Sequence, residues 1–220
     1  MVWARPGPGA EAQGQWTAAL ARGLGRDVTL IDVVEAPRAV DADDEAELHD
    51  RLQHRMNVLQ RRSEADFAEI PTDLQVHLAL KAENDLVESA IPDRRDLAVL
   101  WAPVREHLIR RLLRKGIGTV LVLRCSRHRS ALPWTIGVAE GDTAALLLAN
   151  ALIEGSPEEA SLDIRPILDP DTLDDVPTSV VCASRPTPGW WRSRVLRRRR
   201  EPPTSKRAIL EVYTGNDRTA

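Results

Sequence analysis

Short runs of apolar residues alternate along the chain with segments in which apolar residues recur at every third or fourth position. The runs have the length of strands and are bounded by Pro, Gly or charged residues, whereas the recurring positions predict amphipathic helices. The pattern predicts five strands in the first 125 residues, at 2–4, 28–34, 74–80, 97–101 and 119–123. The helices expected between these strands are centred on residues 16–24, 48–70, 84–91 and 104–115.

Several of the predicted strands have no polar face. Residues 97–101 and 119–123 are almost entirely apolar, which is typical of strands that are buried on both faces of a parallel sheet. Strands that alternate with helices predict a sheet with helices on both sides. Residues 1–125 are therefore expected to form a doubly wound, mostly parallel α/β unit of Rossmann-like type.

The pattern restarts after a polar linker at 125–130. Further strands are expected at 134–139, 160–168, 178–183 and 207–213, with helices at 142–153 and 190–200 and a helical fragment at 172–176. This second unit, residues 131–214, repeats the outer elements of the first and lacks a counterpart of its long helix and of one middle strand. The predicted fold class is thus α/β, with two tandem doubly wound units, the second one shortened, and a tail at 215–220.

Composition agrees with two small globular units. A chain of 220 residues can bury two cores, and its longest apolar run, near 144–152, is too short to cross a bilayer. A net charge of −3 gives no general attraction to nucleic acid or acidic membranes, so only a local patch could bind polyanions. Cys125 and Cys182 lack the spacing of metal ligands or of a redox pair, and no export signal is recognised, so we expect a cytoplasmic protein.

The residues of common catalytic and metal sites do not occur in the patterns that those sites need. The five histidines are not paired at metal-ligand spacing, and no Gly-x-Ser-x-Gly turn occurs. The acidic clusters stand near predicted helix starts, where capping is their usual role. We therefore predict neither catalytic residues nor a metal site, and we expect that the chain is not an enzyme.

Two stretches carry a family resemblance. In 136–145 a strand runs into Glu140, a small-residue turn and a helix, and in 96–124 a strand, a helix with Arg110 and Arg111, and a closing strand follow one another. In these stretches the chain resembles the universal stress protein family, as two degenerate tandem domains. Members of that family often pair through the closing strand. The resemblance therefore implies an intramolecular pseudo-dimer through 120–123 and 209–212, which are expected at sheet edges; a further homodimer stays open.

The resemblance is incomplete where members of the family bind nucleotide. Their loop after the fourth strand is rich in glycine, so that backbone amides approach phosphate. Here the loop 101–106 has no glycine, and Pro103 removes one amide donor. We expect no cofactor, with ATP in the second unit as the alternative, because Glu140 takes the family's acidic position and the loop 184–189 offers an arginine. The candidate nucleotide-binding residues are Glu140, Gly141, Asp142, Arg185, Arg192 and Arg194.

The predicted helix 190–200 is strongly basic and begins with two tryptophans. Such a helix could bind the phosphates of nucleic acid or of lipid headgroups. The alternative is a surface helix whose arginines are solvated, and we favour it because the protein as a whole is acidic. Nucleic acid is therefore not an expected partner, while a membrane surface or a transporter stays open. The residues of this candidate patch for a polyanion or a protein partner are Arg197, Arg198, Arg199 and Arg200.

Together these features predict a non-catalytic stress-response or regulatory protein of the universal-stress-protein type, which acts through protein contacts and has lost ATP binding. One alternative is a cytosolic regulatory module associated with a membrane transporter, with the arginine-rich helix facing a partner or anionic lipid. The other alternative is a protein that binds a nucleotide through its second unit.

Overall fold

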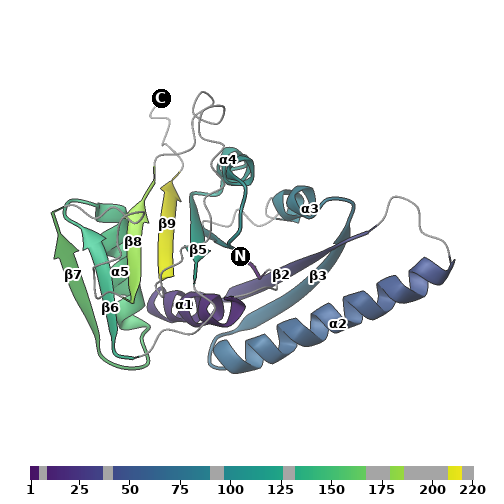
Figure 1. Cartoon of the computed structure of the whole chain (residues 1–220), viewed down its shortest axis with the longest axis horizontal. Helices are drawn as coiled ribbons and strands as arrows, with labels where there is room; N and C mark the ends of the chain where they lie inside the picture. The colour runs from purple at the N-terminus through teal and green to yellow at the C-terminus, as the bar shows by residue number, and fades with distance from the viewer. Residues whose placement is uncertain are drawn as a thin grey trace.

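The computed structural model of the chain describes residues 1–4, 9–36, 42–89, 97–125, 132–166, 179–185 and 208–214 (Figure 1). Nine strands and five helices lie within these residues. The strands are β1 (Val2–Trp3), β2 (Val28–Glu35), β3 (Thr72–Ala79), β4 (Leu97–Trp101), β5 (Thr119–Arg124), β6 (Trp134–Ala139), β7 (Ala160–Arg165), β8 (Val180–Ser184) and β9 (Ala208–Thr214). The helices are α1 (Ala10–Gly23), α2 (Ala42–Asp66), α3 (Ala82–Ser89), α4 (Glu106–Arg114) and α5 (Thr143–Glu154).

Every strand that the apolar pattern predicts is present, and so are the helices predicted before residue 155. The predictions for 126–130, 172–176, 190–200 and the tail at 215–220 lie outside the described residues. Within the described part of the chain, no helix combines the length and the apolarity needed to cross a bilayer.

All nine strands belong to one continuous sheet with the order β3-β2-β1-β4-β5-β9-β8-β6-β7. Neighbouring strands are parallel, with the exception of β5 and β9, which are antiparallel. The segments 120–123 and 209–212, which were expected at the edges of two sheets and as the place where the halves pair, do pair with each other, so that both lie inside one continuous sheet. The edges of the described sheet are β3 and β7.

The helices cover the sheet from two sides (Figure 1). One apolar cluster joins Trp16 of α1, Leu59 of α2 and Leu152 of α5 to one face of the strands. A second cluster joins Leu86 of α3 and Leu108 of α4 to the opposite face. The fold is thus a mostly parallel sheet between two helical layers, as predicted for an α/β protein.

Helices α1 and α5 cross at unusually short distance on the first of these faces. A Cβ atom on Gly23 would lie 1.7 Å from the carbonyl oxygen of Ala151, and a Cβ atom on Gly155 would lie 1.9 Å from that of Ala19. Arg22 Nε donates a hydrogen bond to the Gly155 carbonyl at 3.0 Å. Glycine at both positions therefore allows the two backbones to touch, which side chains would prevent.

Two tryptophans meet in the same interface. Trp16 of α1 and Trp134 of β6 are fully buried, with ring centroids 4.2 Å apart and ring planes inclined by 40°. The contact is of the tilted type that aromatic pairs favour over face-to-face stacking. It joins a helix of the N-terminal half to a strand of the C-terminal half, so the two halves share one core.

Candidate functional site

In open α/β sheets, ligands bind beyond the carboxyl ends of the strands, where successive connections leave toward opposite sides. This sheet has two such places. In the first, between β1 and β4, the chain leaves β1 toward β2 and later returns to β4. In the second, between β6 and β8, it leaves β6 toward β7 and returns to β8. We call them the first and second switch points.

Beside the first switch point, two polar side chains of α1 form hydrogen bonds with residues at the ends of β4 and β5. Gln13 Nε2 donates hydrogen bonds to the carbonyl oxygens of Leu123, at 3.1 Å, and Ala102, at 3.3 Å. Trp101, the last residue of β4, donates from Nε1 to Thr17 Oγ1 at 3.0 Å. Gln13, Thr17 and Trp101 are all buried. The chain itself thus satisfies the polar groups that a ligand at this position would need.

In the loop that follows β4, the first two residues offer no free N–H group. Among its residues, Ala102 uses its N–H on the Leu123 carbonyl at 3.1 Å, and Pro103 has no N–H. Nearby, Glu83 of α3 accepts from His107 Nε2 at 2.5 Å and lies 3.7 Å from Arg105 Nε. The two basic side chains at the start of α4 are therefore both directed to a carboxylate of the protein.

At the second switch point, the carboxylate of Asp142 links the start of α5 to the end of β8. Its Oδ1 accepts from the Ala145 N–H at 3.0 Å and from Ser184 Oγ at 2.6 Å, and its Oδ2 accepts from the Ser184 N–H at 2.7 Å. The N-terminus of a helix is a favourable place for an anion. Asp142 therefore supplies, from within the chain, the negative group that an external phosphate would otherwise provide.

The other residues predicted for this site are placed differently. Gly141 adopts φ +81° in the turn after β6, while Glu140 is exposed and its N–H donates to the Arg165 carbonyl. The carboxylate that reaches β8 belongs to Asp142, two residues after the position that the family resemblance suggested. Arg185 directs its Nε to Glu211 Oε1 at 3.3 Å. The predicted residues Arg192, Arg194, Arg197, Arg198, Arg199 and Arg200 lie outside the described residues.

A buried carboxylate at the centre of the sheet was missed by the sequence analysis. Glu211 of β9 is 1% exposed, and its Oε2 lies 3.0 Å from Arg124 Nη2 and accepts from the Tyr213 hydroxyl at 3.2 Å. Together with Arg185 these residues form the Glu211 cluster, which spans β5, β9 and the end of β8. The available signal was a single acidic residue inside an apolar strand, because glutamate is almost never fully buried without a partner.

A second buried carboxylate lies under α2. Asp32 of β2 is 3% exposed, accepts from the Val33 N–H at 2.9 Å, and lies 3.3 Å from Arg55 Nη1. Burial raises the pKa of Asp32, and Arg55 offsets only part of that shift. Close by, the guanidinium of Arg62 lies 4.9 Å from the centroid of the Trp101 ring, a cation–π contact. Burial lowers the pKa of Arg62, against the attraction of Asp66 and other carboxylates.

The raised pKa of Asp32 predicts a pH-dependent effect of Asp32→Asn. Because the pKa of Asp32 is higher in the folded protein than in the unfolded chain, ionisation of this carboxyl group favours the unfolded chain. Its stabilising effect on the folded protein is complete below the ordinary pKa of 3.8 and is lost as the pH rises through the raised pKa of the folded protein. Asp32→Asn should therefore increase the free energy of unfolding at pH 7, and the gain should shrink as the pH falls toward 3.8. Urea unfolding across this range measures it, with the exposed Asp27→Asn as control. A gain that is constant with pH would contradict the assignment.

The described residues provide no activated nucleophile or metal centre. Burial raises the pKa of both thiols, Cys125 and Cys182, which therefore stay protonated at neutral pH. No group of three or more His, Cys, Asp or Glu side chains within the described ranges is arranged to hold a metal ion.

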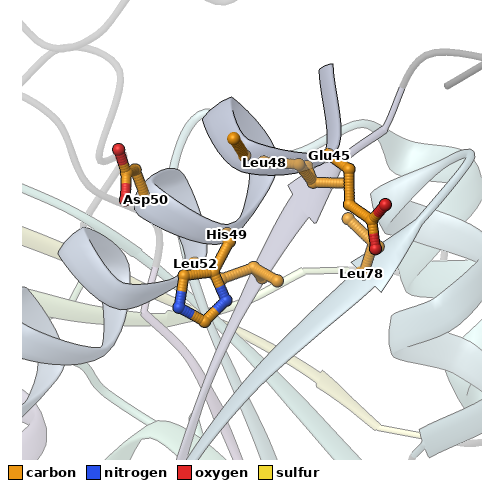
Figure 2. A pocket seen from close by; sticks show the side chains of 7 residues that line it. Glu45, Leu48, His49, Asp50, Leu52 and Leu78 are labelled. Atoms are coloured by element: carbon orange, nitrogen blue, oxygen red, sulfur yellow. The ribbon is translucent and has the colours of Figure 1, made fainter. Parts of the chain in front are cut away.

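A hollow lies between the N-terminal half of α2 and the end of β3 (Figure 2). Its lining mixes apolar and charged side chains, and the only imidazole among them is that of His49. The lining residues are Glu45, Ala46, Leu48, His49, Asp50, Leu52 and Leu78. The hollow lies at the β3 edge of the sheet, and β2 separates it from β1 of the first switch point.

No model of a known protein family matches the chain, and no curated protein matches it either. The geometry of the two switch points is therefore the basis on which a function can be inferred.

Proposed function

We propose that the chain is a non-catalytic regulatory protein of the universal-stress-protein type, in which two units are fused, ATP binding is lost, and the activity consists of contacts with other proteins. The observation that carries the proposal is that the protein's own side chains occupy both switch points. Gln13, Thr17 and Trp101 occupy the first, and Asp142 with Ser184 occupies the second.

The order of the strands supports the fusion of two units. In the N-terminal half, β1 lies between β2 and β4, and β5 follows β4. In the C-terminal half, β6 lies between β7 and β8, and β9 follows β8. The two halves thus follow the same path, except that the second has no described counterpart of β3 or of the helices α2, α3 and α4. A duplication followed by a shortening of the second copy would explain this order.

The electrostatics of the second switch point support the loss of ATP binding. A phosphate there would need the N–H groups of Ala145 and Ser184, and both already donate to Asp142. It would also approach the negative charge of that carboxylate. Arg185, which could compensate, is directed to Glu211. Binding would therefore require the chain to break several of its own hydrogen bonds, each worth about 1 kcal/mol net.

The two edges of the sheet support a role in protein contacts. Leu78 and Leu80 are 45% and 65% exposed at the end of β3, and at the other end Leu147 of α5 and Ile164 of β7 are 66% and 53% exposed. Exposed apolar side chains beside an unpaired strand edge are typical of surfaces that bind other proteins. These are the two places at which we expect partners.

Equilibrium dialysis of the full chain with labelled ATP and Mg²⁺ tests the proposal. We expect no saturable binding below a Kd of roughly 1 mM, which corresponds to about −4 kcal/mol, and no hydrolysis. The matched variant is Asp142→Ala, which uncovers the two N–H groups and should bind ATP or inorganic phosphate better than the unmodified chain. Saturable binding of ATP by the unmodified chain at micromolar concentration, or turnover, would contradict the proposal.

A further inference from the structure

The pairing register relates the two halves residue by residue, given the duplication proposed above, on which this inference rests. Val2 of β1 faces Val99 of β4, and Ile136 of β6 faces Val180 of β8. Val2 and Ile136 both face the layer of α1 and α5. If β1 corresponds to β6 and β4 to β8, and Val2 is taken as equivalent to Ile136, then Val99 and Val180 occupy equivalent positions.

The pairing of β4 with β5 can be compared with that of β8 with β9 in the same way. Val99 faces Leu121 of β5, and Val180 faces Ala208 of β9. Leu121 and Ala208 are therefore equivalent, and the positions two residues further along each strand are equivalent as well.

Those positions are Leu123 and Leu210, and they face each other in the antiparallel pair of β5 and β9. When equivalent residues face each other across antiparallel strands, a local twofold axis passes between them. The crossing of α1 and α5 has the same symmetry. Gly23 approaches Ala151, which lies four residues before Gly155, and Gly155 approaches Ala19, which lies four residues before Gly23.

The residue after Leu123 in β5 is Arg124, and the residue after Leu210 in β9 is Glu211. They are equivalent in position but opposite in charge, and they form a diagonal ion pair on one face of the sheet at 3.0 Å. Glu211 is also held by Arg185 and by the Tyr213 hydroxyl. The carboxylate is therefore fixed by its own half and presents Oε2 to the other half.

We propose that Arg124 and Glu211 determine which strand each half accepts as a neighbour: β5 accepts the acidic strand β9, and neither strand accepts its own equivalent from a second copy of the chain. A β5–β5 pair would place two copies of Arg124 on either side of the axis, and a β9–β9 pair would place two copies of Glu211 there. Like charges buried at such a position disfavour the pairing, whereas the observed pair satisfies both groups.

Charge inversion of the full chain tests this proposal. Arg124→Glu places two carboxylates across the axis. The double variant R185E/E211R keeps an ion pair within the C-terminal half but places a cation against Arg124. Each should lower the equilibrium constant for folding by about 100-fold or more, because each leaves like charges buried. The triple variant R124E/R185E/E211R restores opposite charges everywhere and should recover at least about 10-fold of that loss.

Hydrogen exchange followed by mass spectrometry distinguishes this role from general destabilisation. The two partial inversions should increase exchange in Thr119–Arg124 and Ala208–Thr214 much more than in Val28–Glu35, and the triple variant should restore the protection. If the inverted chains do not fold, the same cycle with Arg124→Met, Glu211→Gln and the double variant measures the coupling. Additive losses, or equal exchange in all three segments, would overturn the proposal and would leave the absence of ATP binding untouched.

Discussion

Alanine at Gly23 is expected to destabilise the protein by about 3 kcal/mol or more. The added methyl group would lie 1.7 Å from the Ala151 carbonyl oxygen, and a backbone atom cannot move aside as a flexible side chain can. Helices α1 and α5 would have to separate, which would also break the hydrogen bond from Arg22 to Gly155. Gly155→Ala should have a similar effect, since its Cβ would lie 1.9 Å from the Ala19 carbonyl oxygen.

Gly25 provides the matched control for this prediction. It lies just after the end of α1 with φ +57°, and a Cβ atom there would meet nothing within 4 Å. Gly25→Ala therefore costs only the strain of the left-handed conformation, about 1 kcal/mol. Urea unfolding of the three variants separates the two effects. If Gly23→Ala were no more harmful than Gly25→Ala, the close crossing of α1 and α5 would not exist in solution.

Trp134→Ala is expected to cost about 3 to 5 kcal/mol, the usual loss when a large buried aromatic side chain is removed. Trp134 is fully buried and packs on Trp16, so its removal opens a cavity between the two halves. Trp16→Ala should cost a similar amount. The double variant should lose less than the sum of the two, because each single change already removes their mutual contact.

The phenylalanine variants provide a sharper comparison. No described residue accepts a hydrogen bond from the indole N–H of Trp134. Trp134→Phe therefore removes a buried donor that makes no bond to the described residues, and it should lower the free energy of unfolding by only about 1 to 2 kcal/mol. Trp101→Phe removes the hydrogen bond to Thr17 and replaces the indole ring that makes the cation–π contact with Arg62. It should lower the free energy of unfolding by more than Trp134→Phe does. Thermal unfolding of both variants measures the difference. An equal or larger loss for Trp134→Phe would contradict this account of the core.

Local periodicity was sufficient to predict the elements of the fold. The nine strands follow from apolar runs such as Leu97–Trp101, and the parallel sheet follows from strands that have no polar face. How the halves join could not be derived from local pattern. The pairing of Thr119–Arg124 with Ala208–Thr214 joins segments that are about 90 residues apart. Nothing in either run specifies its partner, and the pairing was expected only because the family resemblance implied it.

The candidate site was predicted only in outline. Asp142 was among the predicted residues, but the family resemblance gave the acidic position to Glu140; the hydrogen bonds from Ser184 to Asp142 join segments about 40 residues apart, which no local pattern reveals. The close contact of Gly23 with α5 was not predicted, because it is a tertiary feature. Asp32 and Glu211 were missed because a charged residue inside an apolar strand signals a partner without identifying it.

The position of β9 has a consequence for the order in which the sheet can be completed. This strand follows all the others along the chain, yet it lies between β5 and β8 in the interior of the sheet. Until Ala208–Thr214 has left the ribosome, the other eight strands can form only two separate sheets, each with an unpaired edge. Such edges recruit foreign strands, so the growing chain exposes the edges of β5 and β8 to aggregation until β9 is made.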